Sequence, residues 1–278
     1  MNIIKLKKYL DKLYETFDIK YISPDPIEVV HKFTNPLDKE IIGLLSAILA
    51  YGNVKSIINS INFIINIIGS SPINFVSNFN LQKDFHKFSS FKHRFTSGID
   101  ILNVLFILHN IYKKYGSLKE FYYEGYNESD KDIKNSLISF VNRFLFYQTN
   151  DSQTFKYLFP SPQQGSACKR LNLFLRWMVR RGDKLDFGLW DKINPNKLII
   201  PVDTHIARIC KNIGLTTRSS ADWKMAKEIT ENLKKLDPDD PVKYDFAITR
   251  LGIIEKCRGK KVFNMCEHCL IKNICKSL

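Results

Sequence analysis

The chain has 278 residues, 44% of them hydrophobic, which is enough for one large globular domain or two small ones. Its 42 basic residues outnumber its 28 acidic residues, and the formal net charge of +14 favours nucleic acid over a membrane as partner. The heavy use of Lys, Asn and Ile along the whole chain explains part of that excess without any partner. The most apolar windows, 57–68 and 99–111, are shorter than the roughly 20 residues that span a bilayer. With no secretory signal recognisable, we expect a cytoplasmic monomer that does not contact a membrane.

Hydrophobic residues recur at helical spacing along nearly the whole chain, so the predicted fold class is all-α. Residues 1–17 form an amphipathic pattern, and a connector with three prolines follows over 21–36. Residues 148–165 lack periodicity and are predicted to form a long aromatic loop, either ligand-facing or simply fixed to the core by its rings. Further helices are expected at 38–51, 54–68, 73–79, 99–115 and 132–147.

A helix is predicted from Ser166 to about Arg181, with an apolar stripe on one face and basic residues on another. Lys169 falls in its first turn, where the free backbone amides favour an anion and a plain surface lysine is disfavoured. The combination suits an anionic ligand such as a phosphate near the helix start, although a charged helical face is usually just solvated.

The segment 200–214 is predicted to be an extended entry followed by a short helix. Asp203 stands at the N-cap position, where its carboxylate can accept hydrogen bonds from the first turn. The pattern therefore places an acidic side chain at the positive end of a helix, either as a plain cap or as a working group. Cys210 lies on the apolar face of this helix and is assigned to the core. Further along, Ser219 is expected to cap a helix that has Asp222 three residues on.

Four of the six cysteines lie close to the C-terminus with the spacing C-x8-C-x2-C-x5-C. Without an export signal, clustered thiols indicate metal ligands rather than disulfides. A zinc site built on four cysteines usually has two C-x2-C pairs, and only one is present, so four thiolates on one loop favour an iron–sulfur cluster over zinc. The predicted ligands are Cys257, Cys266, Cys269 and Cys275.

Three features of the sequence together resemble the helix-hairpin-helix DNA glycosylase superfamily, and its endonuclease III branch in particular. They are the segment 202–208 (Val-Asp-Thr-His-Ile-Ala-Arg), the four-cysteine loop, and 44–47 (Leu-Leu-Ser-Ala). The resemblance implies a two-lobed helix-hairpin-helix fold with DNA in a cleft and a C-terminal loop that holds a [4Fe-4S] cluster. The domains expected from it are 36–181, and 1–35 together with 182–278.

The function implied by the resemblance is base-excision repair of double-stranded DNA that contains a damaged base or an abasic site. In such a DNA glycosylase with lyase activity, Lys169 would attack C1′ of a flipped-out nucleotide and Asp203 would accept its proton and stabilise the cationic sugar. The competing hypothesis is a non-catalytic nucleic-acid-binding protein that keeps the fold and the cluster. Residues expected to contact DNA are Gln164, Gly165, Arg170, Arg176, His205 and Arg208.

Two positions differ from the superfamily pattern, and a third segment stands outside it. The hairpin position, 161–165, reads Ser-Pro-Gln-Gln-Gly with a single glycine, and Ile48 replaces the glutamine that usually follows Leu-Leu-Ser-Ala. The lesion is therefore not specified by the sequence. Separately, 91–95 reads Phe-Lys-His-Arg-Phe, which either stacks on and pairs with a nucleotide or consists of core aromatics with two exposed cations.

Overall fold

A computed structural model describes residues 2–149 and 152–276, and the chain divides into two compact units. Unit 1 comprises Met1–Ile22 with Pro162–Leu278, and unit 2 comprises Ser23–Ser161. These boundaries differ from the predicted ones after residues 35 and 181. The helix that begins at Lys169 consequently belongs to the same unit as Asp203, and the Pro-rich connector belongs largely to the other unit.

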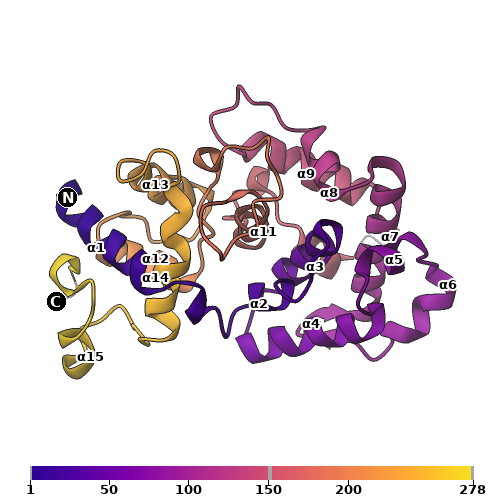
Figure 1. Ribbon diagram of the computed structural model, residues 1–278, viewed down its shortest axis with the longest axis horizontal. Helices are drawn as coiled ribbons and strands as arrows, with labels where there is room; N and C mark the ends of the chain where they lie inside the picture. The colour runs from indigo at the N-terminus through magenta and orange to yellow at the C-terminus, as the bar shows by residue number, and fades with distance from the viewer. Residues whose placement is uncertain (1, 150–151, 277–278) are drawn as a thin grey trace. The chain divides into compact units, whose positions relative to one another are not determined.

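Every named element in the described part of unit 1 is a helix or a 3-10 turn, and the two chain ends lie in this unit (Figure 1). Its elements are α1 (Ile3–Thr16), η1 (Ile19–Tyr21), η3 (Pro162–Gln164), α11 (Lys169–Val179), η4 (Pro195–Lys197), α12 (Thr204–Asn212), α13 (Trp223–Lys234), η5 (Pro241–Tyr244), α14 (Asp245–Ile253), α15 (Phe263–Glu267) and η6 (Lys272–Ile274).

Unit 2 is a second set of helices with one small antiparallel hairpin. Its elements are α2 (Ile27–Val30), α3 (Pro36–Ile48), α4 (Val54–Ile68), α5 (Pro72–Ser77), α6 (Leu81–Asp84), η2 (Phe85–Phe88), β1 (Lys92–His93), β2 (Thr96–Ser97), α7 (Gly98–Tyr115), α8 (Leu118–Tyr123), α9 (Lys134–Phe146) and α10 (Gln153–Leu158). The predicted all-α class is confirmed, because the two strands have only two residues each.

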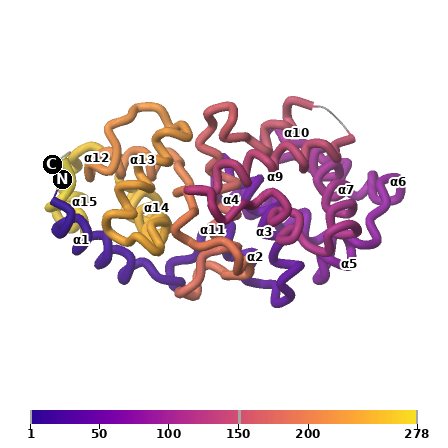
Figure 2. The backbone as a smooth tube through the Cα atoms, turned by 90° about the horizontal axis from the view of Figure 1, so that it is seen from above, coloured from indigo at the N-terminus to yellow at the C-terminus, as the bar shows by residue number. Residues whose placement is uncertain are grey.

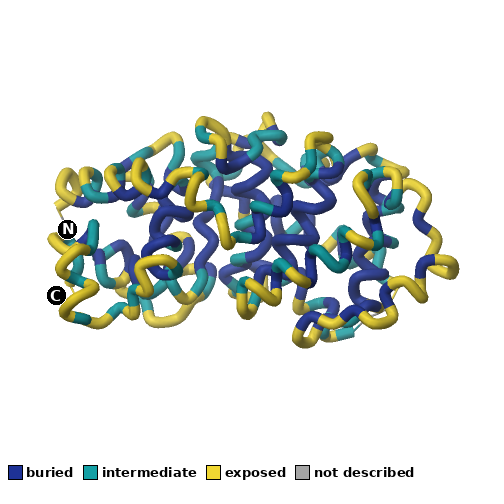
Figure 3. The backbone as a smooth tube through the Cα atoms, turned by 60° about the horizontal axis from the view of Figure 1, so that its bottom comes forward, coloured by how far each residue is buried: buried dark blue, intermediate teal, exposed yellow. Residues whose placement is uncertain are grey.

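Local signals explain where the longest helix of unit 2 begins and ends. Ser97 and Asp100 form a capping box at the start of α7, each side chain binding the other's backbone amide. At its end, Gly116 adopts φ +77°, which glycine reaches without steric cost. The helix between them buries residues around most of its circumference and forms part of the core of unit 2. Figure 3 shows buried stretches of the chain in the interior and exposed turns at the periphery.

The amphipathic N-terminal segment is a helix of unit 1, as predicted, and its apolar face is buried. Leu6, Leu10 and Leu13 are at most 1% exposed. Helix α1 packs on α14 and η5, which come from the other end of the chain (Figures 1 and 2). Tyr14 and Tyr244 meet edge to face in this contact, with ring centroids 6.4 Å apart. The N-terminal helix therefore completes the core that also supports α12.

Two local predictions are wrong. Residues 148–165 are not one long loop, since α10 occupies 153–158 and buries Phe155 and the following Phe159 against Phe144 and each other. Helix α13 is capped by Asp222 itself, whose Oδ1 accepts from the Met225 amide at 2.7 Å, and not by Ser219. Within the described residues, no helix combines the length and the apolar character needed to cross a bilayer.

Candidate functional site

Asp203 caps α12 as the sequence predicts. Its backbone is extended, and Oδ1 accepts a hydrogen bond from the Ile206 amide at 2.8 Å. The side chain is half-buried, while Ile206 and Ile209 on the same helix are buried. The cap uses one carboxylate oxygen. A carboxylate at a helix N-terminus is also favoured electrostatically, so this position holds a negative charge at a defined place.

His205 packs directly on the backbone of α14. A Cβ atom built on Gly252 would come within 2.2 Å of His205 Nδ1, so only glycine leaves room for the imidazole. Arg208 donates through Nη2 to His205 Nδ1 at 3.1 Å, which makes Nδ1 the acceptor and places the ring proton on Nε2. Helices α12 and α14 are thus in close contact at this ring.

Lys169 begins α11, which follows a tight turn. Gly165 has φ +79° after the 3-10 turn of η3, and it is exposed together with Gln164. The Gly165 carbonyl accepts from the Trp223 amide at 3.0 Å, which fixes the turn to the start of α13. Cys168, also in the left-handed region with φ +48°, precedes Lys169, and its side chain does not cap the helix.

The charges of Asp203 and Lys169 both affect the pKa of His205. Burial is the largest effect and lowers the pKa of His205. The negative charge of Asp203 raises this pKa, and the cations Arg208, Lys169 and Arg250 lower it further. The imidazole is therefore neutral at neutral pH. Lys169 at the start of α11 and Asp203 at the start of α12 are therefore both within electrostatic range of His205.

Arg176 does not lie on a nucleic-acid surface, and that prediction is wrong. Its side chain is 4% exposed and forms ion pairs with Asp186 at 3.2 Å and with Asp245. Arg180, one turn on, pairs with Asp186 and Asp240 at 2.8 Å each and is equally enclosed. The guanidinium groups of Arg176 and Arg180 therefore hold α11 inside unit 1 and do not form a charged outer face.

Arg170 is also buried, at 7% exposure, so little of its surface is accessible for the predicted contact with DNA. In Arg208, the guanidinium donates to the Cys257 carbonyl as well as to His205. This half-buried arginine ties α12 to the start of the cysteine loop. Exposed Gln164 and Gly165, together with half-buried His205, remain available for the predicted role.

The cysteine loop is fastened to the other end of the helix that Asp203 begins. Asn212 Nδ2 donates to the Gly259 carbonyl at 3.1 Å, and the Asn212 carbonyl accepts from the Lys276 amide at 2.8 Å. A Cβ on Gly259 would come within 2.3 Å of Arg208 Cδ. Helix α12 therefore connects the candidate carboxylate at its start with the cysteine loop at its end.

The four cysteines of the loop are half-buried thiols that lie close enough to influence one another. Burial raises the pKa of the Cys269 thiol, and Cys257, Cys266 and Cys275 raise it further. The Val262 amide donates to Cys266 Sγ at 3.3 Å. Across residues 2–149 and 152–276, no three His, Cys, Asp or Glu side chains are arranged to hold a metal ion. The four thiols lie near one another on one loop.

Comparison with known families places this geometry in context. The family model described as "Protein of unknown function (DUF2400)" matches residues 25–254. The chain belongs to the DUF2400 family. The matched segment includes Lys169 and Asp203 and ends three residues before Cys257. No match was found among curated proteins or among solved structures.

Sequence reasoning missed the partners that give this DUF2400 protein its buried charge network. Asp245 is fully enclosed, and burial raises its pKa to about 6 against the opposing charge of Arg176. The signal present in the sequence was the spacing of Arg176 and Arg180, four apart at the end of an amphipathic helix. Nothing in that spacing identifies carboxylates 60 or more residues away as their partners.

Proposed function

We propose that this protein is a base-excision DNA glycosylase with associated lyase activity, acting through Lys169 and Asp203. The observation that supports the proposal most is that Lys169 begins α11 and Asp203 caps α12 within one unit, and that both charges are within electrostatic range of His205. The sequence likeness to the helix-hairpin-helix glycosylase superfamily, with its two-lobed fold, names the reaction. The net charge of +14 suits a DNA substrate.

The reaction would begin on a nucleotide flipped out of the duplex. The Lys169 amine attacks C1′, the bond from C1′ to the base breaks, and the base leaves as an anion that takes a proton from water. Asp203 accepts the proton released by the amine and stabilises the positive charge that develops on the sugar. Opening of the sugar ring gives a Schiff base, and loss of a C2′ proton then expels the 3′ phosphate by β-elimination.

Borohydride trapping tests this proposal, because it reduces the Schiff base to a stable covalent adduct. We expect the protein to form an adduct with duplexes from a panel of damaged bases and abasic sites. Lys169→Gln should abolish the adduct, whereas Lys224→Gln, an exposed lysine of the same unit, should leave it unchanged. An adduct that survives Lys169→Gln would assign the nucleophile to another residue.

We also propose that Cys257, Cys266, Cys269 and Cys275 hold a [4Fe-4S] cluster, with zinc as the alternative. The support is a sulfur-only donor set on a short loop, with a backbone amide donating to Cys266 Sγ, an interaction common at cluster sulfurs. A cluster there would cross-link the loop that Arg208 and Asn212 fasten to α12. Its contribution would be structural, since it would stabilise the end of the helix that Asp203 begins.

Metal analysis of anaerobically purified protein tests the cluster. We expect about four iron atoms and four sulfides per chain with a visible sulfur-to-iron absorption band. Cys269→Ser should lower the iron content strongly, and Cys168→Ala, a buried cysteine outside the loop, should leave it unchanged. Stoichiometric zinc in place of iron would contradict the proposal.

A second candidate function is nucleic-acid binding without catalysis. The hydrogen bond from the Ile206 amide to Asp203 Oδ1 favours it, because a cap alone accounts for an aspartate at this position. Salt-sensitive DNA binding with neither base release nor an adduct on the lesion panel would select this candidate.

A further inference from the structure

Unit 2 contains a strongly basic stretch that takes no part in the site of unit 1. Residues 43–99 include five Lys or Arg residues and a single carboxylate, Asp84. That carboxylate is paired with Lys87 at 2.7 Å. The other cations of this stretch, Lys55, Lys92 and Arg94 among them, are exposed. A surface with this imbalance is complementary to a polyanion.

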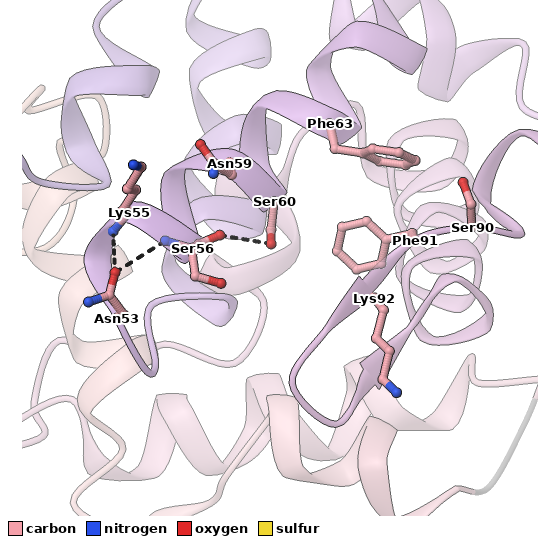
Figure 4. A pocket seen from close by; sticks show the side chains of 9 residues that line it. All are labelled: Asn53, Lys55, Ser56, Asn59, Ser60, Phe63, Ser90, Phe91 and Lys92. Atoms are coloured by element: carbon pink, nitrogen blue, oxygen red, sulfur yellow. Dashed lines mark hydrogen bonds between the residues drawn. The ribbon is translucent and has the colours of Figure 1, made fainter.

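A pocket of about 530 Å³ opens in this basic stretch, between the start of α4 and strand β1 (Figure 4). Figure 4 shows Lys55 with Asn53 on one side and the rings of Phe63 and Phe91 side by side on the other. The two rings are 5.6 Å apart. Hydroxyl, amide and ammonium groups supply the remaining lining, from Ser56, Asn59, Ser60, Ser90 and Lys92.

Three aromatic side chains form a group at the turn of the hairpin that follows β1. Phe95 stacks on Tyr51 with centroids 6.0 Å apart and meets Tyr157 edge to face at 5.7 Å. Phe95 and Tyr157 are 55% and 45% exposed, and exposed apolar groups that gather in one patch are typical of interaction sites. The Arg94 guanidinium lies 5.3 Å from the centre of the Phe95 ring and adds a cation to this aromatic platform.

A buried histidine connects the pocket with the aromatic platform. His93 Nε2 lies 3.0 Å from the Tyr51 carbonyl, and Nδ1 lies 2.9 Å from Oγ of the pocket residue Ser60, whose hydroxyl donates to the Ser56 carbonyl. Burial lowers the pKa of His93, which keeps the ring neutral and this arrangement intact. The Tyr51 hydroxyl bonds the hairpin in turn, 2.7 Å from Thr96 Oγ1. The pocket and the platform are therefore held at fixed positions relative to each other.

We propose that this surface of unit 2 binds an unpaired stretch of DNA, with a base on the aromatic platform and the backbone phosphates at Lys55 and Lys92. Single-stranded nucleic acid is recognised by aromatic rings beside a cationic groove, since every base has a face that stacks. The choice of DNA over RNA rests on the proposed function, whereas the binding of an unpaired strand rests on unit 2 alone.

The test measures binding of the full-length protein to a fluorescent oligothymidylate without any lesion, at several salt concentrations. Phe95→Ala with Tyr157→Ala should weaken binding at least about fivefold, because a stacked base contributes roughly that factor or more. Lys55→Gln with Lys92→Gln should make the slope of the logarithm of the binding constant against the logarithm of the salt concentration shallower by about 1.4. This is about 0.7 for each phosphate that the protein no longer neutralises.

Matched controls come from the same unit. Phe146→Ala removes an aromatic ring that is 84% exposed, and Lys83→Gln removes an exposed cation, and both variants should bind like the unsubstituted protein. Thermal unfolding checks that the substituted proteins stay folded, as the exposure of Phe95 and Tyr157 indicates.

Three outcomes would overturn the inference: no binding of oligothymidylate by the unsubstituted protein at low salt, equal binding by the platform variants, or much tighter binding of oligouridylate. None of them bears on Schiff-base trapping, which depends on Lys169. Conversely, a protein that forms no adduct but loses oligothymidylate binding with the platform variants would sustain this inference and not the proposed glycosylase.

Discussion

Asp203→Asn is expected to lower the rate of base release by about 10²–10³-fold while the protein keeps its stability. Asparagine caps a helix as well as aspartate does, so the bond to the Ile206 amide is retained. The substitution therefore removes only the negative charge that would act on the developing cationic sugar. Single-turnover release of the base from a duplex substrate measures the effect.

Asp203→Ala separates the charge from the cap. This variant should lose the same activity and, in addition, about 1 kcal/mol of the free energy of unfolding, because the first turn of α12 loses its side-chain acceptor. Asp203→Ser provides the converse control, a neutral cap with low activity. Full activity in the Asn and Ser variants would reduce Asp203 to a structural cap and favour the non-catalytic function.

Arg176→Ala is expected to reduce the free energy of unfolding by about 3–5 kcal/mol near neutral pH, because the residue belongs to a buried ion-pair network. The reason is that Asp245 and Asp186 are buried, and the first of them would lose its main counter-charge. Urea unfolding followed by circular dichroism measures the decrease. A surface arginine would show almost none, and that result would contradict the buried network.

The loss of stability caused by Arg176→Ala should become smaller as the pH falls. Burial already raises the pKa of Asp245 to about 6, and removal of Arg176 would raise it further. A carboxyl whose folded pKa exceeds its unfolded pKa binds more protons in the folded state, so acidification through that range stabilises the fold. The stability deficit of the variant should therefore shrink from about pH 8 to about pH 5.

A double substitution provides the control for this interpretation. Arg176→Met combined with Asp245→Asn removes both charges and should recover most of the stability that Arg176→Ala removes. Asp186 keeps Arg180 as its partner at 2.8 Å in this variant. The pH dependence attributed to Asp245 should then disappear. If it persists, another buried carboxyl is responsible.

The helices were largely predictable because their start and stop signals are local. Helix α4 was predicted with its observed bounds, and α12 begins after the predicted cap Asp203, because capping residues and apolar periodicity lie within a few positions of each other. Helix α10 was missed because its six residues provide fewer than two turns of periodicity, and only burial of Phe155 against Phe159 identifies it.

The sequence by itself determined the all-helical class, the acidic cap at Asp203 and the four cysteines of one loop, because each depends on neighbours along the chain. Only the tertiary structure decided that Lys169 and Asp203 share the surroundings of His205, and that Arg176 faces carboxylates inside the unit. It also brought Tyr51 and Tyr157 together with Phe95. A contact between residues that are far apart in the sequence leaves no periodic pattern in it, because the packing of whole helices determines which residues meet.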